Sequence, residues 1–177
     1  MRFTKAIVPI TLFVLLMSLA APAQKRYGRA AKPRPVVSPI DTEALKGLFT
    51  QQRERPLLVN FWATFCDPCR DEFPDLVKID KEYRPRSLDF VTVSLDDMTD
   101  IKTSVPQFLD SMKATMPAYI LNVSDPEPAI NLVDSRWQGD LPATFLYNEK
   151  GELVYKHIGR VNTAELRAAI EKVVSRN

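Results

Sequence analysis

Cys66 and Cys69 are the only cysteines of this 177-residue chain, and two residues separate them. A disulfide framework usually uses more cysteines, and a bridge that closes so short a loop adds little stability. A closed zinc site needs about four ligands, whereas the chain offers two cysteines and one histidine, His157. The pair therefore indicates redox chemistry, with transient binding of Cu(I) by the two thiolates as the alternative.

The cysteine pair falls where a predicted strand meets a predicted helix. Residues 57–63 (LLVNFWA) are continuously apolar, which is typical of a strand buried on both faces, and a helix is expected from about Asp67, bent at Pro74. The positive end of a helix dipole stabilises a thiolate. We therefore expect Cys66 to be exposed and nucleophilic. Cys69, one turn further in, is expected to be shielded and to close the internal disulfide.

Apolar spacing elsewhere predicts alternating helices and strands that end in a hairpin and a helix. A first helix is capped by Asp41 or Thr42 and stops before Pro56, and Asn162 caps the last helix. Strands are expected at residues 88–95, 118–123, 143–147 and 152–158, and further helices at 104–114 and about 126–135. This order predicts an α/β domain with a mixed central sheet and helices on both faces.

Charge is distributed unevenly along the chain, although the net charge is only +2. So small a basic excess argues against a nucleic-acid-binding protein. Residues 1–23 combine two basic residues, an apolar run and small residues at 21–23, and are predicted to be a signal peptide cut after Ala23 or, alternatively, an uncleaved anchor. Residues 24–40 are basic and contain prolines, which predicts a linker, so that residues 41–177 form the domain.

Two segments carry a resemblance to a known family. Residues 61–69 (FWATFCDPC) resemble the active-site segment of the thioredoxin superfamily, and residues 70–74 (RDEFP) are similar to its TlpA/ResA branch of exported thiol–disulfide oxidoreductases. Residues 141–146 (LPATFL) resemble the segment that carries the cis-proline of that superfamily. The resemblance covers about residues 41–177. It implies a thioredoxin-like fold with an additional strand and helix between Cys69 and Pro142.

The resemblance also implies roles for individual residues. Pro142 would be cis and lie beside the cysteine pair, and Leu141 would offer backbone groups to an incoming chain. Glu72 occupies the position of an acid that helps to move protons, with a solvated helix-face carboxylate as the alternative. Asn60 stands where classical thioredoxins carry a buried Asp, which makes Glu72 the better candidate for this role. The substrate-binding surface is expected to comprise Trp62, Asp67, Pro68, Leu141 and Pro142, with core packing as the alternative for Trp62.

Three further polar features complete the sequence-based expectations. Asp67, between the cysteines, should disfavour the Cys66 thiolate and make the couple reducing. Asp96, Asp97 and Asp100 follow a predicted strand, where a cation could bind, but a solvated loop is the better interpretation. His157 is expected to be an ordinary strand histidine.

Together these features predict a monomeric, periplasmic or otherwise extracytoplasmic oxidoreductase, which its N-terminal segment could tether to the membrane. It would reduce disulfides in other exported proteins, by family resemblance those of cytochrome c haem-binding pairs or copper sites. A membrane thiol carrier would supply electrons, and no cofactor beyond the Cys66–Cys69 disulfide is expected. The alternatives are a copper-handling module that uses the thiolates as ligands and a non-catalytic binding scaffold with the thioredoxin fold.

Overall fold

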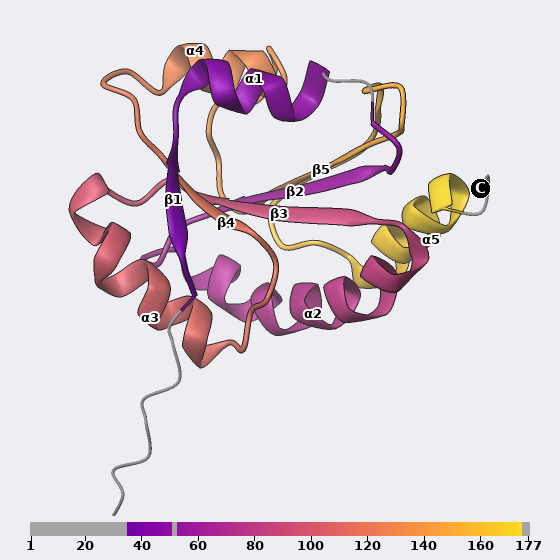
Figure 1. Cartoon of the computed structure of the whole chain (residues 1–177), viewed down its shortest axis with the longest axis horizontal. Coiled ribbons are helices and arrows are strands. Elements are labelled where there is room, and N and C mark those ends of the chain that lie inside the picture. Colours follow the sequence, from indigo (N-terminus) through magenta and orange to yellow (C-terminus); the bar gives the residue numbers. More distant parts are fainter. Residues whose placement is uncertain (1–34, 51–52, 175–177) are drawn as a thin grey trace, which may run out of the picture. The chain divides into compact units, whose positions relative to one another are not determined.

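One mixed sheet forms the centre of the domain in a computed structural model of the chain, which describes residues 35–50 and 53–174. Its six strands follow the order β1-β4-β3-β2-β5-β6 (Figure 1). The strands are β1 (Val37–Ile40), β2 (Leu57–Trp62), β3 (Asp89–Ser94), β4 (Ala118–Leu121), β5 (Ala143–Tyr147) and β6 (Leu153–Ile158). β2 is buried along its whole length, as its continuous apolar run predicts.

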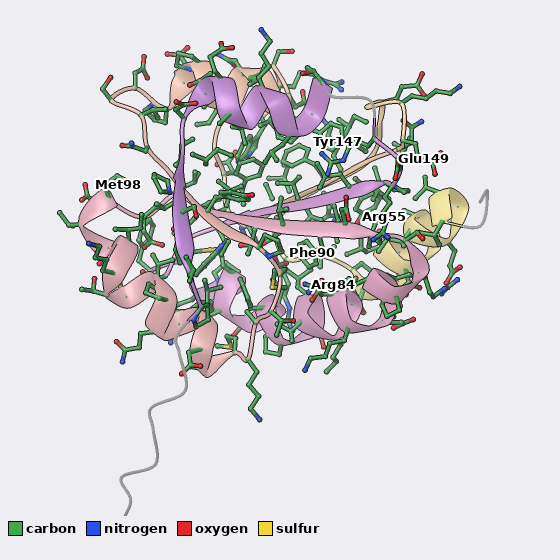
Figure 2. The ribbon with its side chains drawn as sticks, viewed as in Figure 1. Arg55, Arg84, Phe90, Met98, Tyr147 and Glu149 are labelled. Carbon is green, nitrogen blue, oxygen red and sulfur yellow. A yellow bond between two sulfur atoms is a disulfide. The ribbon has the colours of Figure 1, made fainter. Side chains whose placement is uncertain are left out.

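Helices cover both faces of the sheet. In Figure 1, α1 (Thr42–Thr50) and α4 (Glu127–Val133) lie on one face, and α2 (Asp67–Tyr83), α3 (Ser104–Ser111) and α5 (Thr163–Val174) lie on the other. Two apolar clusters, one on each face of the sheet, fill the space between the layers (Figure 2). The α/β class predicted from the sequence is confirmed. Short 3-10 helices are also present, η1 (Arg84–Arg86) and η2 (Met98–Lys102).

Two predicted helix caps are confirmed by hydrogen bonds. The Asp41 carboxylate accepts from the backbone amide of Ala44 at 2.8 Å, and the Asn162 side chain accepts from the amide of Ala164 at 3.0 Å. These bonds satisfy amides that have no partner within the helix. The helix expected over 104–114 is shorter in the structure, where α3 covers Ser104–Ser111.

The register of the sheet brings the cysteine loop and Pro142 to one edge. β2 runs parallel to β3 and antiparallel to β5, and Phe61 lies opposite Ala143. The carboxyl end of β2 therefore meets the amino end of β5. Since Pro142 directly precedes Ala143, it lies at the same sheet edge as the loop that leads from Trp62 to Cys66.

The predicted boundary between linker and domain is wrong by at least four residues. Val37–Ile40, assigned to the linker, form the edge strand β1 and pair in parallel with β4. Pro39 concealed this strand in the sequence, but an edge strand tolerates a proline because one row of its amides needs no partner. Residues 1–34, which hold the predicted signal peptide and most of the predicted linker, lie outside the described residues. Among the described helices, none is long and apolar enough to cross a membrane.

Removal of β1 should destabilise the domain. A chain that begins at Asp41 lacks the buried side chain of Ile40. It also lacks the hydrogen bond of 2.8 Å that the amide of Asn122 donates to the carbonyl of Ile40. We expect the free energy of unfolding to fall by at least about 2 kcal/mol relative to a chain that begins at Pro35. Urea unfolding measures the difference. Val36→Ser, at an exposed position, serves as the control, and equal midpoints for the two chain lengths would contradict the prediction.

Candidate active site

Cys66 and Cys69 are joined by a disulfide at the amino end of α2, with their Cα atoms 5.3 Å apart. Cys66 is the N-cap residue of the helix, and its Sγ accepts a hydrogen bond from the amide of Cys69 at 3.3 Å. Pro68 lies in the first turn, where the helix needs no donor from it. The helix therefore directs both an amide and the positive end of its dipole at the Cys66 sulfur, as expected.

The two cysteines differ in exposure in the predicted order. Cys66 is 9% exposed and Cys69 is 0% exposed. Cys66 is thus the outer cysteine, but it is buried in the disulfide-bonded structure, so the prediction that it is exposed is wrong. The reason is that Cys66 packs in the apolar cluster that also contains Cys69 and Phe73. Asp67 and Pro68 are exposed beside it, which suits both to a surface that a substrate could touch.

Trp62 lies in the core behind the cysteine loop. It is 1% exposed, and its ring packs against Phe73 and Phe108 with centroids 4.9 Å and 4.7 Å away. A substrate cannot touch it, so its predicted place on the docking surface is wrong, and its effect on that surface is limited to packing. The exposed aromatic of this loop is Phe65, at 75% exposure. The position of Phe65 directly before Cys66 was the available signal in the sequence.

The Leu141–Pro142 peptide bond is cis, as the resemblance implied. Leu141 packs against the apolar cluster that contains both cysteines and also against the cluster on the other face. A groove with a volume of about 810 Å³ is lined by residues of this loop, by Phe65 of the cysteine loop and by residues near the ends of β3 and β4. Its lining residues include Phe65, Leu95, Asp96, Asp97, Ile130 and Leu141. The groove combines segments distant in sequence, so the sequence did not predict it.

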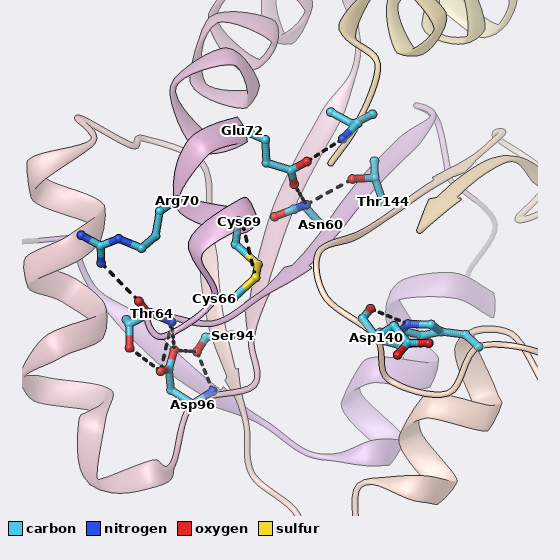
Figure 3. The surroundings of a disulfide bond; sticks show 12 residues. Asn60, Thr64, Cys66, Cys69, Arg70, Glu72, Ser94, Asp96, Asp140 and Thr144 are labelled. Carbon is cyan, nitrogen blue, oxygen red and sulfur yellow. Dashed lines mark hydrogen bonds between the residues drawn. A yellow bond between two sulfur atoms is a disulfide. The ribbon is translucent and has the colours of Figure 1, made fainter. Parts of the chain in front are cut away.

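Glu72 is a buried acid one helical turn beyond Cys69. It is 1% exposed, and its carboxylate accepts from the Asn60 side chain at 2.9 Å and from the Val161 amide at 2.8 Å (Figure 3). Burial raises the pKa of Glu72 to about 7, although these two hydrogen bonds and the charge of Arg160 lower it. The alternative of a solvated carboxylate is therefore wrong. The same Asn60 amide nitrogen also donates to the Thr144 hydroxyl at 3.1 Å.

The remaining polar residues divide between buried and peripheral positions. Asp96 is 5% exposed, so the expectation of a solvated loop is wrong for this member of the acidic cluster. His157 lies on the edge strand β6, and its Nε2 lies 3.0 Å from the carbonyl of Arg160. Within the described ranges, no three His, Cys, Asp or Glu side chains gather as a group that could hold a metal ion.

Comparison with known proteins agrees with this geometry. Residues 41–156 match the family model described as the AhpC/TSA family. The chain belongs to this family. It is 30% identical over 120 residues to the thiol-disulfide oxidoreductase ResA of Halalkalibacterium halodurans. The matched residues make up 66% of this chain and 63% of that protein. It is 24% identical over 151 residues to ResA of Bacillus anthracis, which is 85% of this chain and 82% of that protein.

A solved structure extends the comparison to the fold of this AhpC/TSA-family chain. StoA from Bacillus subtilis superposes with a TM-score of 0.52 at 25% identity, over 66% of this chain and 83% of StoA. The thioredoxin-like fold is thereby confirmed. The relatives named thiol-disulfide oxidoreductases also confirm the predicted class, a thioredoxin-like oxidoreductase.

Glu72 should give the stability of the domain a distinctive dependence on pH. Its pKa is about 7 in the folded chain against an ordinary value of 4.5, so the folded state binds the proton more tightly. Stability from this group is complete below pH 4.5 and is lost as the pH rises toward 7, by up to about 3 kcal/mol. Glu72→Gln should remove this loss.

Urea unfolding at intervals between pH 4 and pH 8 measures that dependence. Asp71→Asn, which changes an exposed carboxylate on the same helix, should retain the slope of the unchanged protein. A Glu72→Gln variant with the same slope as the unchanged protein would rule out Glu72 as the cause.

Proposed function

We propose that this protein reduces disulfides in other exported proteins through the Cys66–Cys69 pair. The observation that carries the proposal is the placement of the pair. Its outer sulfur caps a helix at the same sheet edge as the cis Leu141–Pro142 bond, and Phe65 and Leu141, one residue from each loop, line a groove of about 810 Å³. The similarity to relatives named thiol-disulfide oxidoreductases supports the same chemistry.

The reaction begins from the dithiol. The Cys66 thiolate attacks one sulfur of the substrate disulfide, and the other substrate sulfur leaves as a thiolate that takes up a proton. Cys69 then loses its proton and attacks the Cys66 sulfur, so that the second substrate sulfur leaves and the internal disulfide closes. Two electrons pass from the cysteine pair to the substrate. A thiol carrier in the membrane is proposed to return them.

Glu72 is proposed to accept the proton of Cys69. The two residues are three positions apart on α2 and therefore lie on the same face of the helix. A pKa of about 7 lets the carboxyl group exchange a proton near neutral pH. Hydrogen bonds from Asn60 and Val161 hold the carboxyl group in place while its charge changes.

The substrate is proposed to dock in the groove that Phe65 and Leu141 line. Leu141 would offer its backbone groups to an extended segment, as an edge strand does, while Phe65 and the exposed Asp67 and Pro68 would contact the substrate close to its disulfide. By analogy with the TlpA/ResA branch, the substrate is a haem-binding cysteine pair of a cytochrome c or a cysteine pair of a copper site. The protein is proposed to act as a monomer outside the cytoplasm, with residues 1–23 as its export signal or membrane anchor.

Trapping tests the proposed function. Cys69→Ser removes the thiol that resolves the intermediate, so this variant should accumulate mixed disulfides with exported proteins, and Cys66→Ser should form none. The unchanged protein should also reduce insulin in the presence of dithiothreitol, whereas Cys66→Ser should not. Inactive protein without trapped partners would support a binding scaffold. Stoichiometric Cu(I) binding without reductase activity would support the copper-handling alternative.

The charge of Asp67 should make the couple more reducing. Asp67→Asn removes a carboxylate beside Cys66. The loss of this negative charge stabilises the Cys66 thiolate and hence the reduced form. The reduction potential should rise on the order of 10 to 30 mV, as measured by equilibration with glutathione buffers. Asp71→Asn, further along the helix, should leave the potential unchanged. A reduction potential of the unchanged protein near that of strongly oxidising proteins would refute this idea, as would an unchanged potential for Asp67→Asn.

A further inference from the structure

Asp96 makes an unusual set of hydrogen bonds at the end of β3 (Figure 3). Its two carboxylate oxygens lie 3.1 Å and 3.0 Å from the backbone nitrogen of Thr64. The hydroxyl of Thr64 donates to the same carboxylate at 2.5 Å, and so does the hydroxyl of Ser94, also at 2.5 Å. The carboxylate therefore holds one residue of the cysteine loop by both its main chain and its side chain.

Thr64 is the midpoint of the segment between β2 and Cys66. Its carbonyl accepts from the Arg70 guanidinium at 3.2 Å, and the amide of Cys66 donates to the carbonyl of Ala63 at 3.2 Å. On the strand side, the amide of Leu95 donates to the carbonyl of Trp62 at 2.8 Å. The loop is thus fixed to α2 by Arg70 and to the end of β3 by Asp96 and Leu95.

The neighbouring acids of the cluster do not contribute to this anchor. Asp97 is exposed and accepts from the amide of Thr99, at the start of η2. Asp100 accepts from the hydroxyl of Ser104 at 2.5 Å. Asp96 alone of the three bonds to the cysteine loop, and it is also the most buried of them.

Burial makes the Asp96 contacts strong and their loss costly. A charge-assisted hydrogen bond is stronger than a neutral one, and a buried carboxylate stripped of its donors keeps an uncompensated desolvation cost. Asp96 also lines the groove together with Phe65, the residue that follows Thr64. The anchor therefore fixes the backbone on which Phe65 and Cys66 stand, at the wall of the groove itself.

We propose that Asp96 is a positioning residue that holds the Thr64–Cys66 segment in the geometry required for attack on a docked polypeptide disulfide. The inference rests on the proposed function, and it adds a residue to which the family resemblance gives no role.

Asp96 could affect Cys66 through its charge or through the hydrogen bonds that hold Thr64. The two effects change the reaction rate in opposite directions, so an experiment can separate them. A negative charge disfavours a nearby thiolate, so removal of the Asp96 charge alone would favour the reactive thiolate form of Cys66. Removal of the anchor would instead slow the reaction with a docked polypeptide, because the attacking sulfur is no longer held in place. A small reagent that needs no docking should not suffer this loss.

The test compares Asp96→Asn with Asp100→Asn, which removes one carboxylate from the same cluster and leaves the Thr64 contacts intact. We expect Asp96→Asn to lower kcat/KM for a disulfide-containing peptide about tenfold while its rate of alkylation by iodoacetamide stays equal or rises. Asp100→Asn should change both rates by less than twofold. Peptide reduction by Asp96→Asn at the original rate or faster would overturn the proposal.

A second pair of variants covers the case in which Asp96→Asn does not fold. Thr64→Val removes only the hydroxyl contact to Asp96 and should lower peptide reduction several-fold, whereas Thr64→Ser keeps the hydroxyl and should restore it. Equal rates for the two variants would also overturn the proposal.

If the unchanged protein reduces no disulfide at all, the proposed function fails. In that case the anchor is still tested by amide hydrogen exchange, because Asp96→Asn must accelerate exchange at the Thr64 amide or the anchoring role is wrong.

Discussion

The junction between β2 and α2 is the constraint on which the rest of the structure depends. A strand buried on both faces must end there, and a helix must begin there with amides that have no partner within the helix. Small oxygen-bearing side chains usually accept from such amides, and here the sulfur of Cys66 does so. One sulfur atom thus caps the helix and takes part in the disulfide, so the local stability of the helix start and the chemistry proposed for the cysteine pair depend on the same atom.

Aromatic packing supports this junction from behind. Trp62, at the end of β2, contacts Phe73 of α2 and Phe108 of α3, and those two rings also pack against each other at 5.0 Å. Phe108 belongs to α3, between β3 and β4, and the Arg70 guanidinium lies over its ring at 5.4 Å. Because Arg70 also bonds to the carbonyl of Thr64, α3 is connected to the cysteine loop through both the core and the surface.

Two buried acids near the cysteine pair are satisfied in different ways. Glu72 accepts from two neutral groups, and its burial raises the pKa to about 7, which suits proton exchange. Asp96 instead accepts from Thr64 and Ser94, three donor groups that fix it against the loop. Both residues carry the same functional group. Their surroundings therefore suit Glu72 to the proposed exchange of a proton and Asp96 to the proposed positioning of the backbone.

The amino-acid sequence by itself determined the order of the main helices and strands from residue 41 onward, the cysteine pair at a helix start and the Leu141–Pro142 segment. These features depend on local patterns, such as the apolar run of β2 and the caps at Asp41 and Asn162. Only the tertiary structure decided that residues 37–40 join the sheet, that Trp62 is covered, and that Glu72 and Asp96 are buried. The physical reason is that burial depends on groups brought from elsewhere in the chain: Glu72 bonds to Val161, 89 residues away, and Asp96 to Thr64, 32 residues away.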